Sequence, residues 1–449
     1  MANPFLPLWE YIPDAEPRLF GDRVYLYGSH DLPGGLNFCD YKLKVWSASI
    51  HDLNHWECHG HSIHTRDDAD HKASVPGTDK QFYAPDVVEK DGKYYLYTYI
   101  RDSMGCVSVS DKPEGPFTFL SNYQYAPEDA GDGGIFNDIG VLVDDDGKVY
   151  AYYGFQHSCM NEIDPETMYK VLPGSLKRSV IKDDPDTPTE ERFYEASSPR
   201  KIGDTYYLIY SPCRSPRLAY ATSDSPTGPF TYRGYIIDNG VDFDKPQGND
   251  HGSICKIGDQ WYVFYHRMTN GGITSRRACV EKITILPDGT IPPVEMTSLG
   301  FEDSLSPYYP VKAEIACVLT KDCFVTEKDL FCRVITDIKD GCVIGYKYFE
   351  FGEDFSSKTM KLTVKIKGCG QKGALQVWID APDEGRGGRC IGKVETGLGD
   401  GEYSARVENV TGRHALYFVA ERYTPDDEWM DEFFKGRNIC ELEEFVFLK

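Results

Sequence analysis

Five charged or titratable side chains stand at matching positions of a repeated segment. Asp14, Asp86, Asp138, Glu195 and His251 each lie 9 to 12 residues before a tyrosine that follows a Gly-containing turn. A repeat that carries such groups to the same relative place can bring them together on its axis of pseudo-symmetry. We therefore expect one shared site, built from residues that are far apart along the chain.

Three of these five residues are carboxylic acids, which suits acid–base chemistry. Neighbouring carboxylates repel each other, and this raises the pKa of at least one of them. The most desolvated acid then keeps its proton while another stays ionised as a base, which is the division that glycosidic bond cleavage needs. We expect Asp14, Asp138 and Glu195 to form this catalytic group. The alternative for each acid is an ordinary turn residue that accepts backbone hydrogen bonds, and that alternative is preferred for residues 144–146 in the run DDDG.

Tyr-rich strands must position these residues. They read GDRVYLYG, DGKYYLYT, DGKVYAYYG, GDTYYLIYS and GDQWYVFYH, and their matching tyrosines recur at steps of 70, 55, 57 and 55 residues. Two repeats continue into the related strands SDKPEGPFTF and SDSPTGPFTY, so each unit is longer than one hairpin. Four-stranded units around an axis form a β-propeller. The chain is predicted to be all-β, with a five-bladed β-propeller over residues 1–305 whose last strand lies near 283–294.

A second domain is predicted over residues 306–449, where the Tyr-rich repeat disappears. New strand patterns begin there: CVIGYKYFEF, KLTVKIKG, GALQVWID, HALYFVAE and ELEEFVFLK. Short strands at such intervals fit a β-sandwich of the jelly-roll kind.

Composition excludes several classes of partner. The net charge of −23, with no offsetting Lys/Arg cluster, argues against nucleic acid and anionic membrane surfaces. No stretch approaches the about 18 apolar residues of a membrane span, and the first residues lack a signal-peptide pattern. We expect a cytoplasmic address. The 14 cysteines are scattered singly and are predicted to be free thiols, while the oligomeric state stays open.

Residues 5 to 300 resemble the five-bladed enzymes of glycoside hydrolase family 43. The resemblance implies that Asp14, before GDRVYLYGSHD, is the general base and that Glu195, before SSPRKIGDTYYLIYS, is the general acid. Asp138, before DDDGKVY, would tune the pKa of the acid and orient it. The chain departs from the family pattern in having Asp-Ala and Asp-Ile where Asp-Pro is usual, and EASSP where Glu-Gly-Pro is usual. Glu16 is a rival for the role of base.

The same resemblance implies contacts around the acids. Tyr83 in FYAPDVV would line the sugar pocket, and Asp86 would be structural. His251 in NDHGSI would face a metal ion, often calcium, or water in the channel. The substrate-contacting arginine would be Arg276 or Arg277, with Arg277 preferred, and no organic cofactor is expected. Aromatic rings stack on sugar C–H surfaces, and the candidates for such a wall are Phe38, Tyr83, Phe136 and Phe155.

The C-terminal region resembles a family 6 carbohydrate-binding module in its HALYF and FVF strands. Such modules often bind a sugar chain and hold a structural calcium. Tyr403 occupies a stretch where a tryptophan is often found, so the aromatic clasp is not recognisable. The alternative is a sandwich that only packs on the propeller and shapes the rim of its pocket.

Taken together, the resemblance implies an inverting, exo-acting glycoside hydrolase with an oligosaccharide substrate. It would release terminal α-L-arabinofuranosyl or β-D-xylosyl residues from plant cell-wall oligosaccharides. The alternatives are an endo-arabinanase or galactan-acting hydrolase of the same fold, a glycoside phosphorylase, and a non-catalytic carbohydrate-binding propeller.

Overall fold

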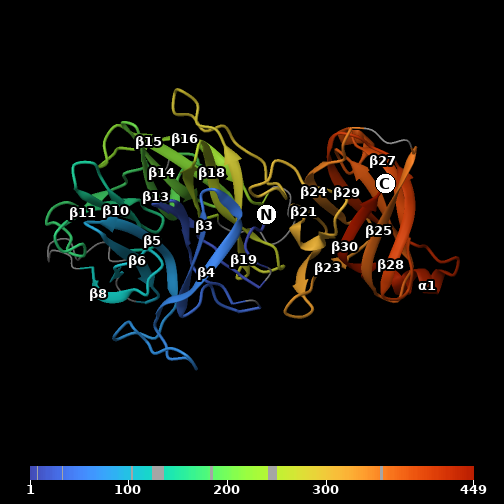
Figure 1. The fold of residues 1–449 in the computed structure, drawn as a ribbon, viewed down its shortest axis with the longest axis horizontal. Helices are drawn as coiled ribbons and strands as arrows, with labels where there is room; N and C mark the ends of the chain where they lie inside the picture. Colours follow the sequence, from blue (N-terminus) through green and yellow to red (C-terminus); the bar gives the residue numbers. More distant parts are fainter. Residues whose placement is uncertain are drawn as a thin grey trace.

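The computed structural model describes residues 1–7, 9–32, 34–102, 105–123, 136–182, 186–240, 250–353 and 357–449. Almost all of its regular structure is β, arranged in two lobes side by side, with the N-terminus between them (Figure 1). The described chain has one short α-helix, α1 (Glu428–Phe434). None of its helices, as far as the chain is described, is long and apolar enough to cross a membrane.

The first lobe contains five antiparallel sheets, which are the blades of the predicted propeller (Figure 1). The first blade contains β1 (Glu16–Phe20), β2 (Arg23–Tyr27), β3 (Lys42–Ser49) and β4 (Asp52–His64). The second contains β5 (Phe82–Lys90), β6 (Lys93–Ile100), β7 (Cys106–Ser110) and β8 (Thr118–Asn122). The third contains β9 (Gly140–Val143), β10 (Val149–Tyr153), β11 (Cys159–Ile163) and β12 (Lys177–Arg178). The fourth contains β13 (Phe193–Ile202), β14 (Thr205–Pro212), β15 (Arg217–Ser223) and β16 (Thr231–Asp238).

The fifth blade has three strands among the described residues, β17 (Ser253–Ile257), β18 (Gln260–Met268) and β19 (Arg276–Ile283). The strand expected over 283–294 is therefore wrong, because β19 ends at Ile283. The N-terminal segment covers the outer edge of β19 instead. The Asn3 side chain accepts from the Val280 N–H at 2.9 Å and donates to the Val280 carbonyl at 2.7 Å. This contact protects an otherwise open strand edge and closes the ring of blades.

The first strand of each blade lies innermost. β1 contacts β5 and β17, and β9 contacts β5 and β13, so neighbouring blades meet through these strands. Each repeat tyrosine lies on the second strand and pairs with the inner one, as Tyr25 does with Arg18 and Tyr207 with Arg200. Asp14, Asp138 and His251 stand two residues before the start of their inner strands. Glu195 and Asp86 lie within β13 and β5. The sheet thus carries them to one end of the propeller channel.

The second lobe is a β-sandwich of two sheets, as predicted. One sheet has the order β22-β23-β30-β25-β28, with β20 paired to β30, and the other has the order β21-β24-β29-β26-β27. Its strands are β20 (Val311–Lys312), β21 (Val318–Leu319), β22 (Phe324–Glu327), β23 (Arg333–Ile338), β24 (Val343–Glu350), β25 (Thr359–Gly368), β26 (Gly373–Ile379), β27 (Arg389–Thr396), β28 (Gly401–Glu408), β29 (Arg413–Arg422) and β30 (Cys440–Leu448). The domain boundary proposed at residue 305 falls in the strand-free segment 284–310.

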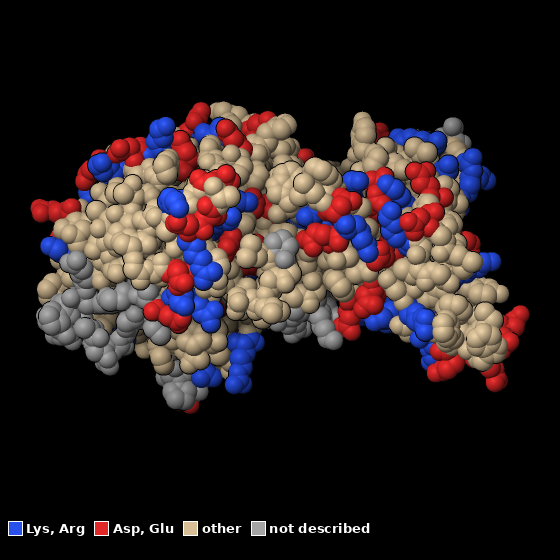
Figure 2. Space-filling model, turned by 90° about the horizontal axis from the view of Figure 1, so that it is seen from below, with Lys and Arg blue, Asp and Glu red and all other residues tan. Residues whose placement is uncertain are grey.

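The two lobes share one hydrophobic cluster. It runs from Ile254, Val263 and Tyr265 in the fifth blade to Tyr346 and Phe445 in the sandwich. All 14 cysteines are free thiols, as predicted. On the face drawn in Figure 2, Lys and Arg side chains alternate with Asp and Glu over both lobes.

Candidate active site

Four of the five predicted groups converge where the inner strands begin. Nδ1 of His251 lies 3.8 Å from Oδ1 of Asp14 and 3.8 Å from Oδ2 of Asp138. The charge of Glu195 acts on Asp138, which places the fourth group in the same cluster. Four separate blades thus contribute to one buried centre.

The backbone is unusual at the carboxylates. Asp14 and Asp138 each stand two residues before their inner strand, with φ of 56° and 49°. Ala196, directly after Glu195, has φ of 70°. Left-handed backbone is uncommon for residues other than glycine and often marks functional sites. Here it turns the side chains toward the channel instead of along the strand.

Asp14 is held as an ionised carboxylate. Arg276 donates from Nη1 to its Oδ1 at 2.7 Å, and Ser29 donates from Oγ to its Oδ2 at 2.6 Å. Burial alone would raise the pKa of Asp14, but the charge of Arg276, with smaller contributions from His251 and His266, lowers it below the usual value. An ionised carboxylate at neutral pH is the state that a general base needs.

Asp138 is shifted in the opposite direction. Burial, then the charges of Glu195 and Asp14, raise its pKa well above the usual value. Its Oδ2 accepts from the Ala196 N–H at 3.1 Å, next to Glu195. Asp138 therefore holds its proton more tightly than an ordinary carboxylic acid, and its hydrogen bond to the Ala196 N–H fixes it to the residue that follows Glu195.

Glu195 is the more open member of this pair. Its side chain is half-buried, and Asn137 donates to its Oε2 at 3.5 Å. The preceding residue, Tyr194, packs its ring 4.9 Å from that of Phe155. A partly exposed acid beside a proton-retaining partner can reach a substrate oxygen.

The arginine of the site is Arg276, so the preference for Arg277 is wrong. Side chains alternate between the two faces of a strand, and on β19 only Arg276 faces the acids. Arg277 points away, with its guanidinium 3.9 Å from Glu314 in the second lobe. Asp31 grips Arg276 through two hydrogen bonds, at 2.9 Å and 3.0 Å.

Asp86 and Glu16 belong to a deeper layer of the channel. Asp86 pairs across the sheet with Tyr97, two residues after the repeat tyrosine of the second blade. Glu16 pairs with Tyr27, which is likewise two residues after the repeat tyrosine of the first blade, so Asp86 and Glu16 occupy equivalent positions. Asp86 binds Arg18 at 2.6 Å, and a matching bridge of 2.7 Å binds Glu16 to an arginine of β13. Asp86 is structural, as expected, and Glu16 is not a rival for the base.

Two of the four aromatic candidates line a cavity that is connected to the acids through Arg276. Phe38 and Tyr83 border a cavity of about 590 Å³ together with Arg101, Ile273 and Thr274, within the about 300–1,000 Å³ usual for ligand pockets. The guanidinium of Arg276 lies 4.9 Å from the Phe38 ring centroid, which joins this cavity to the catalytic cluster.

The other two aromatic candidates lie elsewhere. Phe136 is fully buried and stacks on Tyr123 at 3.9 Å, so it is a core residue and its expected place in the sugar wall is wrong. Phe155 is 45% exposed and stands at the Glu195 side of the site.

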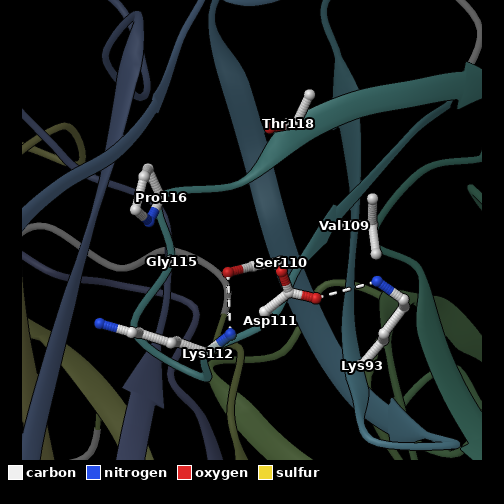
Figure 3. A pocket seen from close by; sticks show the side chains of 8 residues that line it. All are labelled: Lys93, Val109, Ser110, Asp111, Lys112, Gly115, Pro116 and Thr118. Atoms are coloured by element: carbon white, nitrogen blue, oxygen red, sulfur yellow. Dashed lines mark hydrogen bonds and ion pairs between the residues drawn. The ribbon is translucent and has the colours of Figure 1, made fainter.

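A hollow on the second blade has no such cluster of acids. The pocket in Figure 3 lies on the outer part of the second blade, among residues of the β7–β8 turn. Its charged groups are Lys112 and an exposed pair between Lys93 and Asp111, 2.9 Å apart.

His251 alone does not make a calcium site. Burial lowers its pKa, so the imidazole is neutral. Calcium takes 6–8 oxygen ligands, but Asp14 is already bound to Arg276, and Asp86 to Arg18. Among the described residues, no three ligand atoms of His, Cys, Asp or Glu side chains lie within 4.8 Å of one another at His251 or in the sandwich. Backbone carbonyls and waters would have to supply most ligands of a calcium ion there, and calcium at these two places stays a prediction.

Sequence reasoning missed four polar residues that support the acids. Ser29 and Asp31 stand in GSHD directly after the first Tyr-rich strand, which was a readable signal. His266 ends the fifth Tyr-rich strand, and its Nδ1 accepts from the Asp14 N–H at 3.4 Å. The full set is Ser29, Asp31, Asn137 and His266.

Comparison with known proteins agrees with this geometry. The family described as Glycosyl hydrolases family 43 matches residues 3–291. A protein of Thermoclostridium stercorarium named xylosidase/arabinosidase is 37% identical over 93% of this chain and 95% of its own length.

Solved structures show the same similarity. A β-xylosidase/α-arabinofuranosidase from a compost microbial metagenome, determined with xylotriose in a calcium-free form, is 27% identical over 66% of this chain and 98% of its own, with a TM-score of 0.54. An arabinoxylan arabinofuranohydrolase of Bacillus subtilis, 22% identical, matches the fold over 100% of this chain and 97% of its own, with a TM-score of 0.53.

Proposed function

Since the chain belongs to glycosyl hydrolase family 43, we propose that it releases terminal α-L-arabinofuranosyl or β-D-xylosyl residues from plant cell-wall oligosaccharides. One observation carries the proposal. Within a single buried cluster, the pKa of Asp14 is lowered and that of Asp138 is raised. Carboxylates held in different protonation states are what hydrolysis of a glycosidic bond requires.

The proposed reaction is a direct displacement with inversion. Glu195 donates a proton to the leaving oxygen. Asp14 removes a proton from a water on the opposite face of the sugar. Inversion needs the two carboxyl groups about 6.5–9.5 Å apart. Calcium bound beside His251 would act on the structure of the channel, and the proton transfers belong to Glu195 and Asp14.

The pentose specificity is supported by the relatives and by the cavity. The names of the relatives include xylosidase and arabinosidase, and one solved structure contains xylotriose. In this chain, Phe38 and Tyr83 border a cavity, and the Phe38 ring also contacts Arg276, which binds Asp14. Aromatic faces with a few convergent polar groups suit the end of a short sugar chain.

Glu195→Gln tests the acid role. The variant should lose about 10²- to 10⁴-fold in kcat on xylo- and arabino-oligosaccharides, since general acid catalysis contributes that much. It should lose far less on aryl pentosides, whose leaving groups need little protonation. Asp145→Asn, in an exposed turn, is the matched control and should keep full activity. Equal losses on both substrate types would contradict the acid role.

A substrate panel tests the pentose proposal. Aryl α-L-arabinofuranoside, β-D-xylopyranoside and β-D-galactopyranoside should be compared with arabinan and xylan oligomers, and the first anomer released should be identified by NMR. Monosaccharide pentose of inverted configuration is expected. Release of internal fragments would indicate an endo-acting enzyme, and dependence on phosphate would indicate a phosphorylase.

A further inference from the structure

Three histidines and an aspartate meet at the end of β4, outside the catalytic cluster. His61 and His64 end the strand, and Asp68 and His71 follow in the connection to β5, which projects from the first blade (Figure 1). We call these four residues the histidine cluster. Each offers one ligand atom, and the four atoms lie within 4.8 Å of one another. Among the described residues it is the one group with this geometry.

His64, the buried member of the cluster, has a ring nitrogen without a hydrogen-bond partner among the described residues. This nitrogen is Nε2, and the residue is 5% exposed. A buried polar atom without a partner is costly. Its ring stacks on that of His71 at 4.5 Å, and the ring of His61 lies 5.2 Å from both. Three imidazoles this close are stable together only when they are neutral or share a cation.

The rest of the cluster is prepared for a cation. Asp68 is fixed by the His71 N–H, which donates to its Oδ1 at 2.7 Å. Its Oδ2 lies 3.9 Å from Nδ1 of His64 and equally far from the Lys42 ammonium. Lys42 is therefore the competing cation that a metal ion would have to displace.

We propose that the histidine cluster is a structural site for a divalent transition-metal ion, with Zn²⁺ as its preferred occupant. Imidazole nitrogens favour zinc, copper and nickel, whereas calcium and magnesium favour oxygen ligands. Four protein ligands complete the tetrahedral shell of zinc and leave no open position, which is the pattern of a structural site.

Metal binding here would fix the connection between the first two blades. Thr65, next to His64, donates to the Lys80 carbonyl at 2.6 Å, which closes the two ends of this connection on each other. The connection then enters β5, whose second residue, Tyr83, borders the substrate cavity. The ion would thus stabilise a segment that leads into the pocket wall without taking part in the chemistry.

Zinc titration of the full chain tests the proposal. The protein, prepared without a polyhistidine tag and stripped with chelator, should bind one Zn²⁺ per chain by calorimetry. Co²⁺ in its place should give the strong visible absorption of a tetrahedral site. In His71→Ala and Asp68→Asn the affinity should fall more than about 100-fold, beyond the 10–100-fold that loss of an outer partner costs.

The control is His55→Ala, which removes an exposed His–Asp pair on the same strand, where His55 lies 2.6 Å from Asp52. Zinc should still bind this variant and raise its Tm as in the wild type, because an ion that binds only the folded state stabilises it. His71 is partly exposed, so His71→Ala should fold and show no zinc-dependent rise in Tm. Absence of zinc binding by the wild type, or equal binding by all three variants, would overturn the proposal.

Discussion

Asp14 and Asp138 have the same side chain, and their contacts give them opposite chemical states. Asp14 lies against Arg276, which keeps it ionised, whereas Asp138 faces the charges of Glu195 and Asp14 in a buried place. Asp31 holds Arg276 and so acts on the base through another residue. The different protonation states of Asp14 and Asp138 therefore depend on Arg276.

Arg276→Gln should therefore move the acidic limb of the pH profile. Asp14 works as a base only when ionised, so activity is present above its pKa and is lost as pH falls through it. Without the arginine, the effect of burial on Asp14 is no longer offset by a positive charge, so that pKa rises, and the acidic limb of kcat/KM should shift to higher pH. The measurement is kcat/KM against pH on an aryl pentoside.

Arg233→Gln, on the exposed side of the fourth blade, should leave the limb in place. If Arg276→Gln lowers kcat/KM but the acidic limb of the pH profile does not move, the arginine binds substrate and does not set the pKa of Asp14.

Two ion pairs lie one layer below the acids, and they tie the inner strands together. Arg18 of β1 binds Asp86 of β5 at 2.6 Å and donates to the Val141 carbonyl of β9 at 3.0 Å. Arg200 of β13 binds Glu16 of β1 at 2.7 Å. Since inner strands from all sides meet here, these pairs fix the separation of the blades that carry the acids.

Asp86→Ala should destabilise the fold by about 3–5 kcal/mol, because it leaves Arg18 buried without a counter-charge. Urea unfolding followed by tryptophan fluorescence measures the change. The matched control is Asp145→Ala, which breaks the exposed pair with Lys201 (2.8 Å) and should cost no more than about 1 kcal/mol. Similar costs for both variants would show that the buried pair does not hold the blades.

The two lobes behave as one body in their packing. They share a hydrophobic cluster, and Arg277 of the fifth blade lies 3.9 Å from Glu314 of the sandwich lobe, both buried. The Val325 N–H donates to the Thr269 carbonyl at 2.9 Å, which adds a backbone contact between the lobes. Tyr403, where an aromatic clasp would be sought, packs against the same cluster. Sugar binding by the sandwich stays a prediction.

Calorimetric unfolding should therefore show one cooperative transition for the whole chain. A chain ending at residue 305 should unfold at a lower temperature, since it exposes the propeller side of the shared cluster to water. Trp429→Ala, on the exposed helix α1, should leave the transition unchanged. Two separate transitions, or an unaltered Tm after truncation, would show that the lobes are independent.

The sequence alone determined the repeat, the all-β class and the positions of Asp14, Asp138, Glu195 and His251. Local strand patterns and regular spacing contain that information, because a repeat places equivalent residues in equivalent positions. The spacing even marked Asp86, which stands 9 residues before its tyrosine where Asp14 stands 11. The difference of two residues matches the pairing in the sheets. Asp86 occupies the position of Glu16, in the deeper layer, and not that of Asp14.

Only the tertiary structure decided which neighbours each side chain meets. Arg276 and Arg277 are adjacent in sequence, and the face of β19 that turns inward separates their roles. Phe136 looked like a pocket aromatic, but packing with Tyr123 buries it. The histidine cluster depends on how the chain folds back after β4. These contacts join residues far apart in the sequence, and their pKa shifts follow from burial and charge in three dimensions, which spacing along the chain does not encode.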